Sequence, residues 1–305
     1  MKYVAVVLPI FAIMGLGWFL RRIKVIKGDV GNLENILYWG ILPALLFRSI
    51  FYSGGFAKED LNLLYVVYVS FIIMPAVSFV MSPWKKNPQR RGVSLLTCMR
   101  SNNIYMGIPV VSLVMGKVGV TAASKYLGIS LVGYHIFSVA CGQLGLYGKL
   151  NFNAVSKTLK ELAKNPLIIS CIFAMVCSEI FRINLPLWID ESLKILSNSA
   201  TGLALLALGA NIRLREMGES LKETWIDTLM KNAVYPLLLM FLFSFWPVGH
   251  NVRNAVILVS AMPVAVNTFI VAKGMNMDHD YAARLIATST FVSLITIPLW
   301  VAILF

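Results

Sequence analysis

The chain has 305 residues, of which 58% are hydrophobic and only 13% are charged, and its mean hydropathy is +0.75. Soluble domains carry about 25% charged residues, so this composition excludes an ordinary soluble protein and indicates one embedded in a lipid bilayer. The formal net charge is +13 at pH 7. The basic residues lie mostly in connections between apolar segments, which favours contact with anionic lipid and excludes a nucleic-acid-binding patch.

Ten apolar segments are candidates to cross a bilayer, for which a helix needs about 20 residues. In chain order they are residues 3–20, 34–50, 61–82, 92–116, 121–147, 166–182, 190–211, 225–246, 252–273 and 281–304. The first segment has the length of a signal peptide, but Arg21 and Arg22 follow it and no small-residue cleavage site is obvious. We therefore expect an all-α integral membrane protein with ten transmembrane helices and short connections.

Basic residues are divided unequally between the connections. When the amino-terminal tail is numbered zero, the odd connections hold 16 basic residues and the even connections hold 8. The odd set consists of Arg21, Arg22, Lys24, Lys27, Lys85, Lys86, Arg90, Arg91, Lys149, Lys157, Lys160, Lys164, Arg213, Arg215, Lys222 and Lys273. Cytoplasmic connections carry the excess of lysine and arginine. This pattern predicts cytoplasmic odd connections and both termini outside, in a multi-pass protein of the cell membrane (the inner or plasma membrane).

Four landmarks recur in the same order in the two halves of the chain. Their separations are 157, 160, 161 and 154 residues, for Pro9 and Pro166, Ala44-Leu45-Leu46 and Ala204-Leu205-Leu206, Pro75 and Pro236, and Pro109 and Pro263. The pattern predicts two five-helix repeats, residues 1–150 and 151–305. Because five is odd, the second repeat must be inverted, as in many secondary transporters. The basic connection at 148–165 is either an amphipathic helix on the cytoplasmic surface or a plain linker.

Two prolines interrupt the fourth and ninth segments at matching places. Pro109 and Pro263 each remove a backbone donor, and proline tends to break a helix. A break in a membrane helix persists only where protein or a cavity satisfies the freed backbone groups. Paired breaks in corresponding helices point to a transporter's binding site. Pro109 suits the first turn of a new half-helix, whose positive end would face the middle of the membrane.

Polar residues beside these prolines are the candidate substrate-binding residues. Ser101, Asn102 and Asn103 precede Pro109, and Asn267 lies about one turn after Pro263. Amide groups and two half-helix ends can hold a carboxylate without a fixed cation. The alternative is that the prolines only kink their helices and the asparagines bond neighbouring helices. With Pro109 and Pro263, these four residues form the predicted binding site.

Two further polar residues inside apolar segments have two interpretations each. Arginine inside a membrane segment is costly and usually functional, so Arg100 either attracts an anion or extends its side chain to the cytoplasmic surface. His135 either relays a proton or is a neutral ring bonded within the helix bundle.

The sequence shows no pattern typical of a metal or cofactor site. Cys98, Cys141, Cys171 and Cys177 lack metal-ligand spacing and are expected to be free thiols. Glu179 and Asp227 are the acidic residues nearest to mid-segment, and both lie close to predicted ends, which disfavours sodium coupling through a buried carboxylate. Neutral oxygens could still hold a sodium ion, from Ser101, Asn102, Thr288, Ser289 and Thr290.

The motifs around both breaks resemble the auxin efflux carrier family, which includes the plant PIN carriers and many bacterial relatives. The similar segments are Ser101–Pro109 and Ala261–Lys273, together with Ile41–Phe47 and Asn165–Ile168. The resemblance implies a ten-helix fold in which broken helices four and nine cross. It also implies a scaffold of helices 1, 2, 6 and 7, a moving transport domain of helices 3–5 and 8–10, and a homodimer.

The same resemblance implies export of organic anions, and Asn102 matches an asparagine that the family has seven residues before the crossover proline. Asn267 occupies a position that is apolar in the plant carriers, and their long cytoplasmic loop is absent here. A small carboxylate or an amino-acid-like anion is therefore more plausible than auxin. The predicted partners are this anion and the bilayer, with no cofactor and no nucleic acid.

Three other functions compete with this prediction. An intramembrane hydrolase is disfavoured because the chain has no His-Glu-x-x-His, no pair of mid-membrane aspartates and no Gly-x-Ser-x-Gly motif. A sodium-coupled organic-anion symporter on a related inverted fold remains an alternative, as does a non-transporting membrane sensor. The sequence thus predicts a secondary transporter, not an enzyme, that exports a small organic anion by elevator-like alternating access.

Overall fold

A computed structural model describes residues 2–26, 30–52, 60–149, 160, 163–210 and 217–305 of the chain. The described part is all-helical, and its only strand-like feature is an isolated bridge between Ser101 and Val264. This confirms the all-α prediction for these residues. Most of the connection at 148–165, for which a surface helix or a linker was expected, lies outside the described residues.

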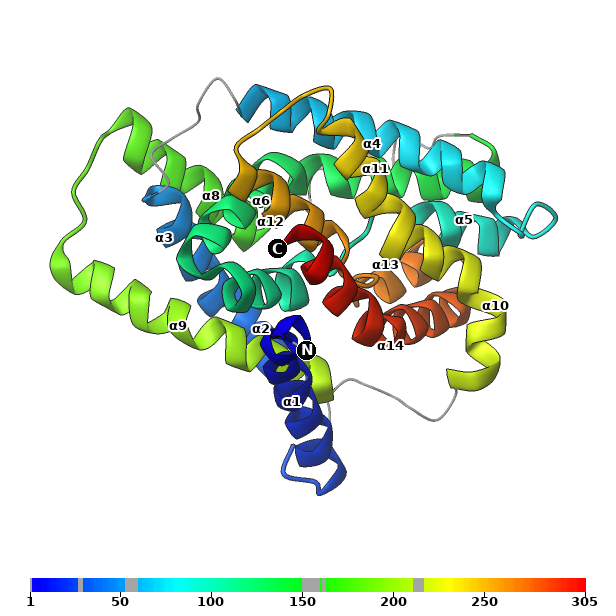
Figure 1. The fold of residues 1–305 in the computed structure, drawn as a ribbon, viewed down its shortest axis with the longest axis horizontal. Helices are drawn as coiled ribbons and strands as arrows, with labels where there is room; N and C mark the ends of the chain where they lie inside the picture. Colours follow the sequence, from blue (N-terminus) through cyan, green and yellow to red (C-terminus); the bar gives the residue numbers. More distant parts are fainter. Residues whose placement is uncertain (1, 27–29, 53–59, 150–159, 161–162, 211–216) are drawn as a thin grey trace.

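The helices follow the chain in the order that Figure 1 labels. The first half contains α1 (Lys2–Arg22), α2 (Gly31–Ile36), η1 (Leu37–Ile41), α3 (Leu42–Phe51), α4 (Asp60–Met81), α5 (Pro88–Thr97), η2 (Asn103–Gly107) and α6 (Ile108–Tyr147). The second half contains α8 (Pro166–Met175), η3 (Val176–Ile180), α9 (Leu187–Ala210), α10 (Met217–Leu229), η5 (Met230–Val234), α11 (Tyr235–Leu242), α12 (His250–Ser260), α13 (Thr268–Gly274) and α14 (His279–Leu304).

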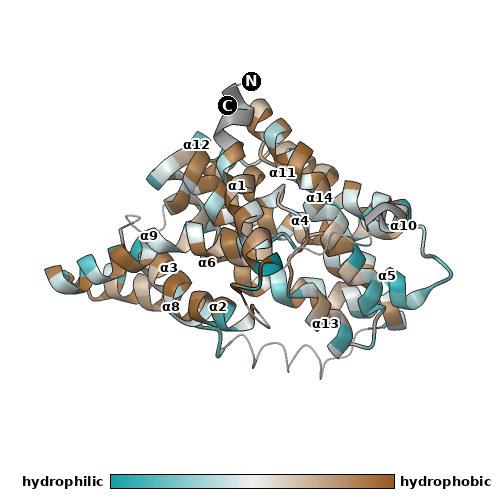
Figure 2. Ribbon diagram, turned by 90° about the horizontal axis from the view of Figure 1, so that it is seen from below, coloured by the Kyte–Doolittle hydropathy of each residue, from teal (hydrophilic) through white to brown (hydrophobic). Residues whose placement is uncertain are grey.

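Four stretches of described helix are long and apolar enough to cross a membrane. They are Asp60–Met81, Asn103–Tyr147, Leu187–Ala210 and His279–Leu304. Figure 2 shows hydrophobic residues over most helix surfaces, with hydrophilic residues gathered near α5, α10 and α13 at the edges of the molecule. The arrangement of ten helices as two inverted repeats stays a prediction.

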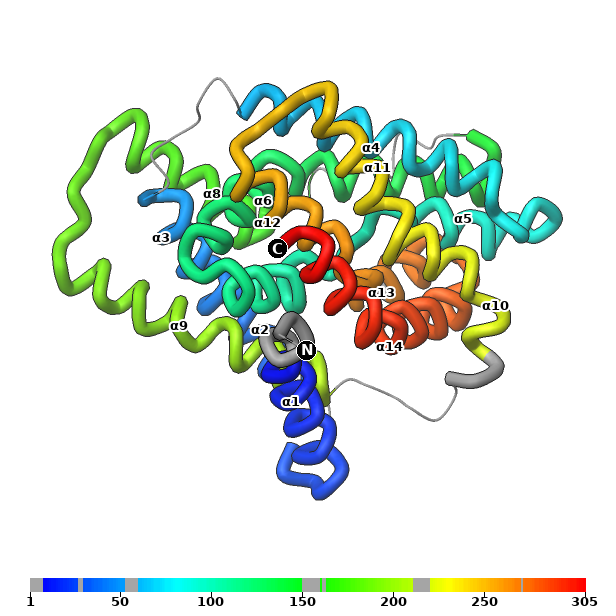
Figure 3. Tube along the Cα trace, in the orientation of Figure 1, coloured from blue at the N-terminus to red at the C-terminus, as the bar shows by residue number. Residues whose placement is uncertain are grey.

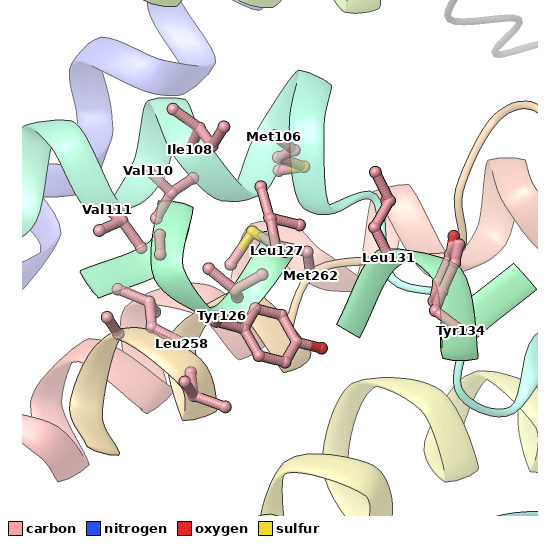
Figure 4. Close-up of a cluster of buried hydrophobic side chains, with 14 of the residues drawn as sticks. Met106, Ile108, Val110, Val111, Tyr126, Leu127, Leu131, Tyr134, Leu258 and Met262 are labelled. Atoms are coloured by element: carbon pink, nitrogen blue, oxygen red, sulfur yellow. The ribbon is translucent and has the colours of Figure 1, made fainter. Parts of the chain in front are cut away.

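The turn between the predicted fourth and fifth segments is made at a single glycine. Gly116 has φ 63° and ψ −149° inside the helical stretch of α6. This backbone conformation is strained for residues with a β-carbon and accessible to glycine. The two parts of α6 therefore meet in a sharp bend, and Figure 4 shows side chains from both parts packed together, such as Val111 on one and Leu127 on the other.

Helices α1 and α9 pack at very close range, side by side in Figures 1 and 3. A β-carbon at Gly17 would overlap the carbonyl oxygen of Leu206, and one at Gly209 would overlap that of Met14. Small residues permit this close approach of membrane helices. Nη1 of Arg21 donates to the carbonyl oxygen of Ala210 at 3.0 Å, which satisfies a free group at the end of α9.

Three prolines are absorbed into continuous helix by a π-helical turn. The turns η1, η2 and η5 end two residues before Pro43, Pro109 and Pro236, respectively. A π-turn inserts one extra residue into a helix and interrupts its regular hydrogen bonds. Prolines and π-turns are both common places for such an interruption. Pro109 lies in the first turn of α6, as expected, and the π-turn η2 extends the helical stretch back to Asn103.

Candidate functional site

The two helix breaks pair with each other through their backbones. The fourth predicted segment is not helical between Thr97 and Asn103, and the ninth is not helical between Ser260 and Thr268. We call these two helix breaks, residues 98–102 and 261–267, the crossover. The amide of Asn102 donates to the carbonyl oxygen of Pro263 at 2.8 Å, and the amide of Ala265 donates to that of Arg100 at 2.9 Å. These bonds satisfy backbone groups that lipid could not.

Side chains complete the crossover at the end of α12. Oγ of Ser101 donates to the carbonyl oxygen of Ser260 at 3.0 Å. Nζ of Lys231 donates to the same oxygen at 2.6 Å and to the carbonyl oxygen of Met262 at 2.8 Å. Both carbonyls lie where the helical ladder of α12 stops, so they have no partner within that helix.

Arg100 lies buried in the crossover with a relative exposure of 0%. Its Nη1 donates to Oγ of Ser138 at 2.8 Å, its Nη2 to Oδ1 of Asn267 at 3.1 Å, and its Nε to Oγ1 of Thr268 at 3.3 Å. The guanidinium carbon is 4.9 Å from the ring centre of Tyr134. The side chain therefore does not extend to the cytoplasmic surface, because neutral oxygens and an aromatic face hold its charge inside the bundle.

The positive charge of Arg100 has no acidic partner close by. Among the described residues, no aspartate or glutamate forms an ion pair with its guanidinium. Buried charges in proteins are usually paired or bind an ion, because desolvation of an ionised group is costly. The crossover thus carries a fixed positive charge that is compensated only by neutral groups.

A cavity of about 50 Å³ opens beside the crossover. Its lining residues are Ser101, Asn102, Asn103, Ile104, Tyr105, Leu131, Tyr134, His135, Ala265, Val266 and Asn267. Five of the residues predicted to act on the substrate or a proton therefore share one cavity: Ser101, Asn102, Asn103, His135 and Asn267. Pro109, Pro263 and Arg100 do not line it.

The three asparagines present different atoms for binding. Nδ2 of Asn102 and Oδ1 of Asn103 are buried and have no hydrogen-bond partner among the described residues. Oδ1 of Asn267 accepts from Arg100, so the NH₂ group of Asn267 remains to bind a ligand. Ile104 and Tyr105, which also line the cavity, are at the start of a helical stretch, where backbone amides have no partner within the helix. The cavity wall is therefore rich in hydrogen-bond donors.

His135 lies beside these donors with its ring edge-on to Tyr134, at a distance of 4.8 Å between ring centres. The hydroxyl of Tyr134 donates to the carbonyl oxygen of Ser101 at 3.4 Å. This hydrogen bond connects Tyr134, the neighbour of His135, to the backbone of the crossover. A proton relay through His135 stays a prediction.

Asp227 occupies a different place from the one expected. We expected it near a helix end, but α10 begins at Met217, eight residues before the predicted segment, and runs on through η5 and α11. Asp227 is therefore inside a long helix and buried, and it accepts from Oγ of Ser94 at 2.6 Å and from the hydroxyl of Tyr281 at 2.5 Å. It does not line the cavity.

The neutral oxygens considered for sodium are separated in the structure. Thr288 shares hydrogen bonds with Thr224 and Thr228, Oγ of Ser289 accepts from the amide of Val264, and Thr290 donates to its own helix. None of these three residues lines the cavity. Within the described ranges, no group of three or more histidine, cysteine, aspartate or glutamate residues could hold a metal ion, and the four cysteines are free.

Lys231 is a residue bonded to the crossover that the sequence analysis missed. It lies in η5 with a relative exposure of 0%. A lysine inside the predicted segment 225–246 is itself a signal, because ionisable residues within membrane segments are rare and usually functional.

Known proteins are similar to the chain over nearly its whole length. A family model described as membrane transport protein matches residues 3–146 and 150–301. An uncharacterized transporter of Methanocaldococcus jannaschii is 24% identical over 304 residues, which cover 97% of this chain and 96% of that protein. An uncharacterized transporter of Methanothermobacter thermautotrophicus is 22% identical over 312 residues, which cover 98% of this chain and 97% of that protein.

A third relative is longer than this chain. The lysosomal cholesterol signaling protein of Mus musculus is 23% identical over 312 residues, which cover 94% of this chain and 36% of that protein. The residues that the family model matches include both helix breaks and every residue that lines the cavity.

Proposed function

The chain belongs to the membrane transport protein family, which includes the auxin efflux carriers, and we propose that it exports a small organic anion through its crossover. It is a multi-pass membrane protein of a transporter family. The single observation that carries the choice of an anion is the buried guanidinium of Arg100, which has only neutral partners and stands behind a donor-rich cavity.

The charge of Arg100 supports an anion over a cation or a neutral solute. At a separation of about 6 Å and an effective dielectric constant of about 20, two opposite charges attract by about 3 kcal/mol. Arg100 does not line the cavity, so its attraction acts through Asn267 and Tyr134, which contact it. A cation in the cavity would be repelled by a similar amount.

The hydrogen-bonding groups support a carboxylate as the ligand. NH₂ groups of Asn102 and Asn267 donate, and hydrogen bonds from neutral donors to an ionised acceptor are about twice as strong as neutral ones. The unpartnered oxygen of Asn103 suits a hydroxyl or an amino group elsewhere on the same ligand. His135 and Tyr134 also line the cavity.

The size of the cavity supports a small ligand. A cavity of about 50 Å³ holds about three to five water molecules, since each requires about 10–15 Å³ of such volume. A carboxylate with about four to six non-hydrogen atoms suits this space, and an indole-containing acid such as auxin does not.

An elevator-like movement is the mechanism that we propose for transport. The helices assigned to the scaffold are joined to each other by the glycine contacts of α1 and α9, by an Arg48–Asp190 ion pair of 2.8 Å between α3 and α9, and by the rings of Phe47 and Phe173. The helices assigned to the transport domain contain the whole crossover and its cavity. Movement of this second group against the first would carry the cavity across the membrane.

Transport currents in proteoliposomes test the proposal. Purified protein would be challenged with a panel of mono- and dicarboxylates, with sodium or N-methyl-D-glucamine as the cation and with a pH step. We expect a current for a small carboxylate in the wild type and in Asn62→Ala, whose side chain bonds Pro247 away from the cavity, and no current in Asn102→Ala. Sodium-dependent currents would favour the symporter alternative.

The absence of any transport current would favour a non-transporting sensor. The mouse relative is described as a signaling protein, so binding without transport is a specific alternative. Binding of a carboxylate, measured as thermal stabilisation of the purified protein, combined with the absence of current and of tracer exchange, would replace the transport proposal by sensing.

A further inference from the structure

The ammonium group of Lys231 lies where α12 ends in the crossover. Nζ donates to the carbonyl oxygens of Ser260 and Met262 at 2.6 and 2.8 Å. The carbonyl oxygen of Ser260 also accepts from Ser101, so both of its lone pairs are used. Lys231 therefore joins α10–α11 to the end of α12 and, through Ser260, to the first break.

The surroundings of this group are suited to a cation. The carboxyl end of a helix carries a partial negative charge, and the ring centre of Tyr235 is 5.2 Å from Nζ. Among the described residues, no acidic side chain forms an ion pair with Lys231. Asp227, one turn earlier on the same helix, is bonded to Ser94 and Tyr281 instead.

Backbone carbonyls at a broken helix end have a second use in transporters. Unwound carbonyls and the carboxyl ends of half-helices are groups that coordinate a coupling sodium ion in inverted-repeat transporters. The carbonyl oxygens of Ser260 and Met262 form such a set, and here a side-chain ammonium already bonds to both. A lysine ammonium and a monovalent metal ion carry the same charge and bind the same oxygens.

We propose that Lys231 is a tethered cation that fills a monovalent-cation site at the end of α12. The site consists of the carbonyl oxygens of Ser260 and Met262 and the ring of Tyr235. Because the ammonium is covalently tethered, it cannot leave the site, and the protein needs no sodium or potassium ion there. Removal of the side chain opens the site to a free small cation.

Chemical rescue tests this proposal without any transport substrate. Lys231→Ala lacks the propylammonium part of the side chain, so n-propylammonium chloride supplies the missing piece. Thermal unfolding of the purified variant would be followed with propylammonium, ammonium, sodium or potassium chloride, each against N-methyl-D-glucamine chloride at equal concentration. We expect the melting temperature to fall by about 5 °C or more in Lys231→Ala and to recover in a saturable manner with propylammonium or a small cation.

Matched controls separate this effect from general salt stabilisation. Lys273→Ala removes a lysine exposed at the end of α13, and neither it nor the wild type should respond to the same salts by more than about 1 °C. Equal responses in all three proteins, or no saturable response in Lys231→Ala, overturn the proposal.

The wild type provides a test that can be carried out even if Lys231→Ala does not fold. Its thermal stability should be the same in sodium, potassium and N-methyl-D-glucamine chloride, and saturable stabilisation by sodium or potassium overturns the tethered-cation assignment. This readout needs no anion, so its failure is distinguishable from failure of the proposed transport function. Lys231→Met, which keeps the length and removes the charge, should be unstable and should not be rescued, because its side chain still fills the space.

Discussion

Nη2 of Arg100 donates to Oδ1 of Asn267 at 3.1 Å, which joins two residues 167 positions apart across the crossover. This bond determines which end of the asparagine amide is left for a ligand. With its oxygen engaged, Asn267 offers its NH₂ group as a donor. The arginine thus acts on the cavity in two ways, through its charge and through the orientation of Asn267.

Replacement of Arg100 tests both effects. Arg100→Gln removes the charge, and we expect anion affinity to fall at least about tenfold, which corresponds to about 1.4 kcal/mol. Arg100→Lys keeps the charge but cannot bond Ser138, Asn267 and Thr268 together, so an intermediate loss is expected. Binding would be measured by titration of the carboxylate that gives a current. Arg253→Gln in α12 is the control, and equal affinity in Arg100→Gln and this control contradicts the role of the charge.

The amides of Asn102 and Asn267 should both contribute to binding. Hydrogen bonds to charged groups are worth about 1.5–3 kcal/mol, so Asn102→Ala and Asn267→Ala should each weaken anion binding by about tenfold or more. The double variant indicates whether the two amides share one ligand, because residues that contact the same group are not additive. Wild-type affinity in both single variants would remove the crossover cavity as the binding site. Their expression should match that of Asn62→Ala.

Close packing of α1 against α9 should not tolerate a methyl group. A β-carbon at Gly209 would overlap the carbonyl oxygen of Met14, whereas one at Gly202 of the same helix would meet no atom within 4 Å. Overpacking in a core costs about 1–3 kcal/mol or more. Gly209→Ala should therefore lower the melting temperature in detergent, and Gly202→Ala should leave it unchanged. A stable Gly209→Ala protein would mean that the helices are farther apart than described.

Asp278 should stabilise the protein in a pH-dependent way. Burial by itself raises the pKa of Asp278, but the amide of Tyr281 and the guanidinium of Arg90 outweigh it and hold the pKa below its ordinary value of 3.8. A pKa lowered by folding contributes stability that is present above the unfolded pKa and is lost as the pH falls through the folded pKa.

The variant Asp278→Asn isolates this charge, because asparagine is an equally good N-cap for α14. It should be less stable than the wild type by about 0.5–1 kcal/mol at pH 7, and the difference should shrink as the pH falls through the lowered pKa of folded Asp278. Thermal unfolding between pH 3 and pH 8 measures the difference. Asp280→Asn, at an exposed site in the same turn, should show no such change. A difference for Asp278→Asn that is constant across this range contradicts the Arg90 contact as its source.

The sequence predicts the crossover residues well because breaks in membrane helices must satisfy their backbone groups. Ser101, Asn102, Asn103 and Asn267 flank two such breaks, and the breaks pair with each other, which brings these residues to one cavity. Pro263 lies within its break, whereas Pro109 lies in the first turn of α6, directly after the π-turn η2. Hydropathy cannot distinguish these two outcomes, since both prolines lie in equally apolar surroundings.

Burial and partners of ionisable residues depend on contacts between distant helices, which hydropathy does not report. The partners of Arg100 lie 38, 167 and 168 positions away, so its burial does not follow from its position in the fourth segment. Asp227 was expected near a helix end because the predicted segment begins eight residues after the helix does. In a long helix Asp227 and Lys231 face neighbouring helices rather than a membrane surface.

The most direct test of anion binding in the crossover cavity is the affinity of Asn102→Asp. Aspartate has the size of asparagine, but it replaces an unpartnered donor with a negative charge in the cavity wall. We predict that binding of the transported carboxylate, measured by titration above pH 6, is abolished in Asn102→Asp and unchanged in Asn62→Asp. Wild-type affinity of Asn102→Asp for the anion would contradict the account.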